Sequence, residues 1–141
     1  MTFSNIPPET IAAYTETVYR VFGDTAFEII IGQSCESLGI LYKKFGCNSS
    51  AFITAFNPKG VPISEAENTS AQLNLEERLR QSSIQVIDGI GVDSAGRWPS
   101  ESSVLALGLS LDEAKYWGTE FQQNAIVWIP VDITPQLILL R

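Results

Sequence analysis

The sequence predicts an α+β fold, with a single globular domain over residues 1–141. It is expected to be an open mixed β-sheet of about six to seven strands with three to four helices. Three observations lead to this class. A chain of 141 residues that is 45% apolar and 18% charged has the size and composition of one domain with a real core. Runs of β-branched and aromatic residues are mixed with amphipathic helical patterns, without strict alternation. Clusters of Gly, Pro and Asn separate these runs.

The first third of the chain predicts a helix, a hairpin and a second helix. Pro7-Pro8-Glu9 begins a short helix that carries Ile11 and Tyr14 on one face. The following residues are β-branched and aromatic, so the helix is expected to give way directly to a strand. The predicted antiparallel strands cover residues 17–22 and 26–31, with a turn at 23–24. Ser34 is expected to cap a helix that runs to about Phe45 and ends at Gly46.

The middle of the chain predicts a strand, a long helix and a short strand. An apolar strand over residues 51–56 is broken by Asn57-Pro58-Lys59-Gly60. Ser64 and Glu67 form a capping-box pattern that starts a helix to about Ser82. A short strand over residues 84–87 follows, and a polar, glycine-rich loop is expected over residues 89–102.

The last third repeats this arrangement. A strand over residues 104–107 precedes a second capping box, Ser110 with Glu113, and a helix over residues 110–122. The final predicted strands cover residues 125–129 and 136–140. Strands 17–22 and 136–140 are expected at the margins of the sheet. The apolar end of the last strand could pair across a homodimer, so both a monomer and a homodimer are considered.

Topology predicts where a site would lie. Strands 51–56 and 84–87 are joined through a helix, as are strands 104–107 and 125–129, so each pair is expected to run parallel. The loop between strands 84–87 and 104–107 lacks a helix signal, which predicts an antiparallel connection. The ends of the first pair and the starts of the second pair then share one edge of the sheet, where ligands of open α/β sheets often bind.

The polar residues expected at this edge form the candidate site. The candidate ligand-binding residues are Asn57, Asn68, Trp98, Glu101, Ser103, Gln123 and Asn124, with Ser64, Asp93 and Arg97 nearby. Glu101 is the candidate for any catalytic role. Most of these residues also have structural explanations: Asn before Pro forms turns, Ser64 caps a helix, and Trp98 could cover the core. Asn68 is the exception, because Asn inside a helix is mildly unfavourable.

Composition argues against several classes of function. The chain has no His, which removes the commonest general base and metal ligand, so neither a metal site nor a cofactor is predicted. Cys35 and Cys47 each stand alone and are expected to be reduced thiols. The net charge of −7, with no basic cluster beyond Lys43-Lys44, argues against nucleic-acid binding. Neither GxGxxG nor GxxxxGK[ST] occurs, so no nucleotide-binding motif is present.

No apolar run approaches the roughly 18–20 residues that span a membrane. Residues Met1 to Pro8 lack the basic and apolar segments of a secretion signal. A cytoplasmic location without membrane association is therefore expected.

Several stretches together resemble an uncharacterised bacterial family, domain of unknown function 3293. The matching stretches are residues 53–58, Glu67-Asn68, Gly89-Ile90-Gly91, Trp98-Pro99, Glu101 with Ser103 to Leu105, and Phe121 with residues 123–128. Gln122 stands where that family favours Gly, and Ser100 where an acid is common. The resemblance implies a bacterial source and no particular activity, but its motif residues coincide with the edge that topology predicts.

Three functions remain open at this point. The one that the sequence favours is a binding module for a small polar ligand or peptide, because amides and one carboxylate suit hydrogen-bond recognition. The second is a protein-interaction module that uses an acidic surface. The third is a His-free enzyme in which Glu101 acts as a general base or holds Mg²⁺.

Overall fold

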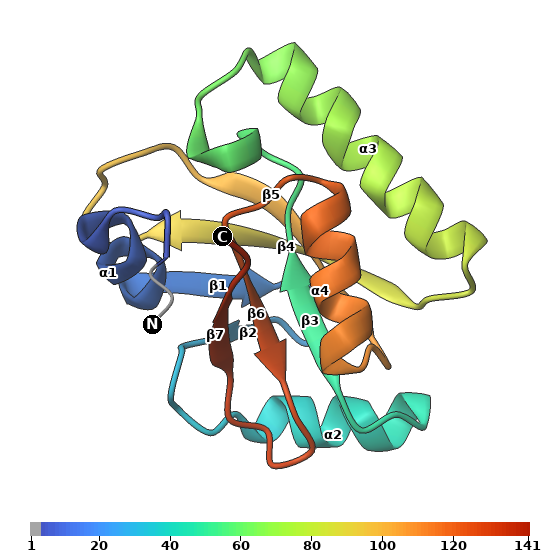
Figure 1. Ribbon diagram of the computed structural model, residues 1–141. Helices are drawn as coiled ribbons and strands as arrows, with labels where there is room; N and C mark the ends of the chain where they lie inside the picture. The colour runs from blue at the N-terminus through green and yellow to red at the C-terminus, as the bar shows by residue number, and fades with distance from the viewer. Residues whose placement is uncertain (1–3) are drawn as a thin grey trace.

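The structure is a computed structural model that describes residues 4–141, and Figure 1 shows its elements. The helices are α1 (Pro8–Glu16), α2 (Glu36–Phe45), α3 (Glu65–Gln81), α4 (Leu111–Glu120) and the 3₁₀ helix η1 (Pro58–Gly60). The strands are β1 (Thr17–Val21), β2 (Phe27–Ile29), β3 (Ser50–Ile53), β4 (Val86–Asp93), β5 (Glu101–Leu107), β6 (Ala125–Ile129) and β7 (Gln136–Leu139). The predicted α+β class is confirmed.

The strands form one open, curled sheet in the order β2-β1-β4-β5-β3-β6-β7 (Figure 1). A mixed sheet was expected, but within residues 4–141 every hydrogen-bonded pair of strands is antiparallel. The difference has a simple cause. The crossover strands β3 and β4 do run parallel, as do β5 and β6, but in each case another strand lies between them. The parallel relation predicted from the sequence is therefore present without parallel pairing.

Strand β4 is twice as long as the predicted strand over residues 84–87, and it extends through Gly89 and Gly91 to Asp93. The expected loop over residues 89–102 shrinks to residues 94–100. Gly89 explains the difference. A Cβ atom on Gly89 would lie 2.5 Å from the backbone oxygen of Arg20 and 2.7 Å from the ring of Phe52. Gly89 is needed because the neighbouring strand and the ring of Phe52 lie too close for a side chain. The sequence alone does not distinguish such a glycine from one in a flexible loop.

Two other details of the prediction are corrected. Strand β1 was expected at a margin, but it lies between β2 and β4, and the short strand β2 forms that edge instead. Helix α2 begins after Cys35, so Ser34 is not its cap. The direct step from α1 into β1 is as predicted, because the hydroxyl of Thr17 donates to the carbonyl oxygen of Ala13 (2.7 Å) and closes the last helical turn.

The two faces of the sheet carry separate cores. On one face, side chains of β3, β5 and β6 pack against α3 and α4, centred on Leu75, Leu79 and Trp117. On the other face, the strands pack against α2 through Leu38 and Tyr42. Figure 1 shows α2 beside the end of the sheet where β3 begins and β6 finishes. Helix α2 therefore leaves the end of that face nearest the predicted edge for other side chains.

Within residues 4–141, no helix has the length and apolar character that crossing a bilayer requires.

Two glycines on strand β4 should respond differently to the same substitution. Gly89→Ala is expected to lower the free energy of unfolding by about 1–3 kcal/mol, because its Cβ would overlap backbone and ring atoms. The matched control is Gly91→Ala, whose Cβ would meet only ordinary contacts, 3.8 Å from Thr17 and 3.9 Å from Tyr19. Urea unfolding measures both changes. Equal losses for the two variants would contradict this account of β4.

Candidate functional site

A pocket of about 420 Å³ opens at the end of the sheet where β3 and β4 finish and β5 and β6 begin. This is the edge that the sequence predicts. Phe52 and Val127 line it from the α2 face of the sheet, so the pocket lies on the part of that face that α2 leaves uncovered. Six of the seven candidate ligand-binding residues line it, namely Asn57, Trp98, Glu101, Ser103, Gln123 and Asn124. Asn68 is not among the lining residues.

Asn57 links three segments at this edge. Its backbone has a left-handed conformation (φ 47°), as its position in the turn after β3 requires. Its backbone N–H donates to Oδ1 of Asn68 (2.8 Å), and its own Oδ1 accepts from Nδ2 of Asn68 (2.8 Å). Its Nδ2 donates to a carboxylate oxygen of Glu101 (3.1 Å). The turn, the start of α3 and the start of β5 are thus held together by one side chain.

Asn68 is buried and lies behind Asn57. Because both its oxygen and its nitrogen bond to Asn57, it fixes the orientation of that side chain rather than facing the pocket. This explains an Asn inside a helix. Gln72, one turn further along α3, is also buried, and its Oε1 accepts the backbone N–H of Ala55 (2.8 Å). Two consecutive turns of α3 therefore bind the chain just after β3.

Glu101 is the half-buried carboxylate of the pocket. Burial raises its pKa to about 7, and the hydrogen bond from Asn57 lowers the pKa by a smaller amount. Asn57 is its one side-chain partner within residues 4–141, and no Lys or Arg of that range forms an ion pair with it. A carboxyl group with a pKa near neutrality exchanges a proton readily at physiological pH.

Asn124 joins the pocket wall to both ends of the chain. Its Nδ2 donates to the hydroxyl of Tyr14 (3.0 Å), and its Oδ1 accepts from the guanidinium of Arg141 (2.7 Å). Gly60 passes so closely that a Cβ there would lie 2.6 Å from Nδ2. The sequence did not identify Tyr14, Gly60 or Arg141 as part of this region, because their contacts depend on how α1 and η1 pack.

Gln123 and Ser103 are buried and have internal partners. Nε2 of Gln123 donates to the carbonyl oxygens of Phe56 (3.1 Å) and Phe121 (3.3 Å), which holds the start of β6 against the end of β3. The hydroxyl of Ser103 donates to the carbonyl oxygen of Glu101 (3.0 Å). Both residues line the pocket while stabilising its wall.

Ion pairs of Arg97 hold the loop over residues 94–100 in place. Arg97 forms hydrogen bonds with both carboxylate oxygens of Asp93 (2.8 and 3.0 Å) and with Glu16 of α1 (2.9 Å). The Arg97 guanidinium lowers the pKa of Asp93 to about 2. It also lies 5.4 Å from the ring of Trp98. Asp93 and Arg97 were expected at this edge; they lie outside the pocket wall and position Trp98, which is part of it.

The rest of the pocket wall is largely apolar and aromatic. Tyr19, Phe52, Val127 and Leu137 come from β1, β3, β6 and β7, and Gly91 of β4 contributes no side chain. Strands that are far apart in the sheet order line one pocket because the sheet curls. The sequence analysis missed these residues, since an apolar side chain in a strand is typical of a core.

The arrangement does not resemble a metal centre. No group of three or more His, Cys, Asp or Glu side chains in the described part of the chain could hold an ion. Cys35 and Cys47 are free thiols.

Replacing Glu101 by the uncharged Gln should change how stability depends on pH. A carboxyl group whose pKa is raised on folding favours the native state below its unfolded pKa, and this contribution is lost as pH rises through the folded pKa. The difference in unfolding free energy, Glu101→Gln minus wild type, should therefore grow as pH rises from about 4.5 to about 7 and level off above pH 7. A shift from 4.5 to about 7 corresponds to a limit on the order of 3 kcal/mol. Urea unfolding measures it, and Glu36→Gln on the exposed start of α2 is the control. A difference independent of pH would contradict the raised pKa.

Two substitutions of Asn57 separate its backbone role from its side-chain role. Asn57→Gly removes the side-chain hydrogen bonds but tolerates positive φ, and a loss of about 1–3 kcal/mol is expected. Asn57→Ala also strains the backbone and should be about 1 kcal/mol less stable than the Gly variant. Both should raise the pKa of Glu101, because its hydrogen bond is gone. NMR titration of the Glu101 carboxyl measures that pKa, and an unchanged value would exclude the Asn57 contact.

Comparison with known proteins gives one result. A family profile described as "Protein of unknown function (DUF3293)" matches residues 53–126, which begin at the end of β3 and finish within β6. No match is found among curated proteins or among solved structures. The matched segment contains Asn57, Asn68, Glu101 and Asn124. It covers more than half of the 141 residues, so this chain belongs to the family described as protein of unknown function (DUF3293).

Proposed function

We propose that this protein binds a small organic molecule in the pocket at the end of the sheet. The supporting observation is Glu101, a half-buried carboxylate that faces a largely apolar pocket without a positively charged protein partner among the described residues. Burying a carboxyl group costs free energy unless an interaction offsets the cost. Its one amide partner, Asn57, offsets only part of it, as the raised pKa indicates.

The shape of the pocket supports the same proposal. A volume of about 420 Å³ falls within the range of small-molecule sites, roughly 300–1,000 Å³, and such sites combine apolar walls with a few polar groups. In the proposed complex, Glu101, Ser103 and Asn124 contact the polar part of the ligand. Phe52, Val127 and Leu137 contact its apolar part. Asn68 acts indirectly, by orienting Asn57.

A second candidate function is general acid–base catalysis by Glu101. The observation that favours it is the pKa of about 7, which suits a group that both takes up and releases a proton.

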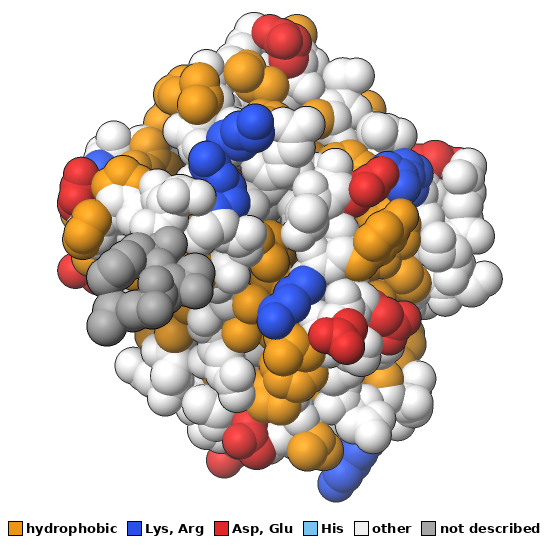
Figure 2. All heavy atoms as spheres, viewed as in Figure 1, with side chains coloured by type: hydrophobic (Ala, Val, Ile, Leu, Met, Phe, Trp, Pro, Cys, Tyr) orange, Lys and Arg blue, Asp and Glu red, His pale blue; other side chains and the backbone are white. Residues whose placement is uncertain are grey.

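A docking surface for a basic protein is less well supported. Figure 2 shows acidic, basic and apolar side chains interspersed on the face drawn. We further propose that the protein acts in the cytoplasm, where free thiols such as Cys35 and Cys47 remain reduced.

The test is capture of a ligand from cell extract. Protein purified without denaturation is analysed by native mass spectrometry, and any released compound is identified. Wild type and the control Glu36→Gln should carry the same small molecule, whereas Glu101→Gln should carry at least about tenfold less. Gly91→Ala, which adds a methyl group to the pocket wall, should also reduce occupancy without loss of stability. Equal occupancy in all four proteins would overturn the proposal.

A further inference from the structure

The hydrogen-bond pattern of the pocket indicates which ligand groups it accepts. Four hydroxyl groups among its lining residues already donate their hydrogen to backbone carbonyl oxygens of the protein. The donations run from Thr17 to Ala13, from Tyr19 to Tyr14, from Thr54 to Ser102 and from Ser103 to Glu101. Each hydroxyl oxygen keeps acceptor capacity after donating. These groups therefore offer a ligand acceptors rather than donors.

The side-chain amides of the wall are already bonded within the protein. The NH₂ groups of Asn57, Gln123 and Asn124 each donate to a protein oxygen. Glu101 adds a carboxylate of which Oε2 accepts from Asn57, while Oε1 has no donor among residues 4–141. The open oxygen of Glu101 is therefore the acceptor that a ligand meets here, and a ligand group placed against it must supply a hydrogen.

Aromatic rings strengthen this preference for positive charge. Tyr14, Tyr19, Phe52, Phe56 and Trp98 all line the pocket. The face of an aromatic ring attracts a cation that lies over it. The net charge of −7 also raises the local concentration of cations around the molecule.

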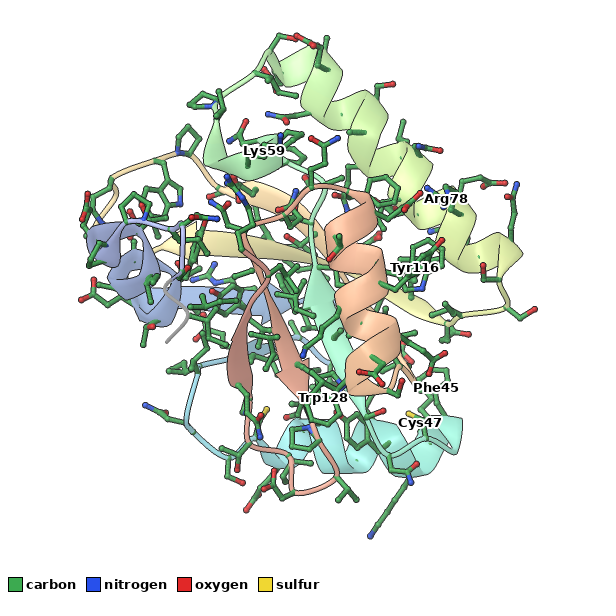
Figure 3. All side chains as sticks on the ribbon, viewed as in Figure 1. Phe45, Cys47, Lys59, Arg78, Tyr116 and Trp128 are labelled. Carbon is green, nitrogen blue, oxygen red and sulfur yellow. The ribbon has the colours of Figure 1, made fainter. Side chains whose placement is uncertain are left out.

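Two positive side chains limit the class of cation. Lys59 is exposed, lies on η1 as labelled in Figure 3, and lines the pocket. The guanidinium of Arg141 bonds to Asn124 and to the carbonyl oxygen of Lys59 (3.4 Å). Both would repel a second positive charge on the ligand. The remainder of the ligand is therefore neutral or acidic.

From this arrangement we infer that the ligand carries one protonated amine, which pairs with the carboxylate of Glu101 while its apolar part lies against Phe52 and Val127. The inference rests on the proposed function and names the chemical class of its ligand. A single ammonium group supplies up to three donors. One of these donors fits the open oxygen of Glu101.

Three commercial compounds of similar size provide the test. They are 2-phenylethylamine, the neutral 2-phenylethanol and the anionic 3-phenylpropionate. Isothermal titration and thermal shift, with each compound up to about 20 mM, measure binding in the millimolar range. The amine should bind at least about tenfold more tightly than the alcohol, and the carboxylate should not bind. Glu101→Gln should abolish the preference for the amine without changing alcohol binding, and Glu36→Gln should leave both unchanged.

Proton release gives a second readout that a structural role of Glu101 would not produce. At pH 7, binding of the amine should release protons, because the raised pKa leaves part of Glu101 protonated in the free protein and the ammonium holds it ionised. Titration in two buffers of different ionisation enthalpy measures this, and Glu101→Gln should release none. Tyr14 and Tyr19 stay protonated at pH 7, because burial raises both pKa values. The other charged groups near this end of the sheet are Glu16, Lys59, Asp93, Arg97 and Arg141.

The outcomes separate this inference from the proposed function. Equal binding of amine and alcohol, unchanged amine binding by Glu101→Gln, or no saturable effect of the amine overturns the ammonium inference. Identification of a captured ligand without an amine also overturns it, but leaves the pocket as a binding site. Failure to capture any ligand, with the amine preference intact, counts against the proposed cellular function alone.

Discussion

The side chain of Asn57 supplies the contact on which the rest of the site depends. The backbone of Asn57 is left-handed in the turn after β3. Its backbone N–H and side-chain oxygen bond to Asn68 in the first turns of α3, and its side-chain NH₂ donates to Glu101 at the start of β5. These segments are 11 and 44 residues away along the chain. Their hydrogen bonds form at the edge of a sheet, where backbone groups no longer have strand partners. The same side chain thus closes the end of the sheet and sets the position of the carboxylate.

The position of Glu101 follows from that closure. A carboxylate at the first residue of a strand can normally turn outward to water. Here the turn after β3 and the loop over residues 94–100 restrict Glu101 to the pocket. Its burial there raises its pKa to about 7. The loop is itself held by Arg97 between Asp93 and Glu16, so ion pairs outside the pocket fix the position of Trp98 in its wall. The ion pairs of Arg97 outside the pocket and the burial of Glu101 inside it thus belong to the same end of the sheet.

Local rules were sufficient to predict much of this structure. Capping signals at Ser64 and Ser110 correctly began α3 and α4. Two helical crossovers fixed which strand ends share an edge, and this correctly brought Asn57, Glu101 and Asn124 to one pocket. Predictions from the sequence were wrong or incomplete where contacts between distant segments determine a residue's place. Gly89 was assigned to a loop because a glycine required by a neighbouring ring resembles one required by a turn. Tyr14 was placed on a helix face, but its contact with Asn124 spans 110 residues and depends on the curl of the sheet.

The two faces of the sheet have different surroundings. On one face, β3, β5 and β6 are covered by α3 and α4, whose buried Leu75, Leu79 and Trp117 form a continuous core. The opposite face is covered by α2 over one end, and the pocket occupies the other. If the pocket has the proposed binding role, substitutions among the pocket residues that lie far from the Leu75 core would alter recognition while most of the folding free energy is retained. Under the proposed binding role, members of a family that shares this layout would be able to differ in their ligands while keeping one scaffold.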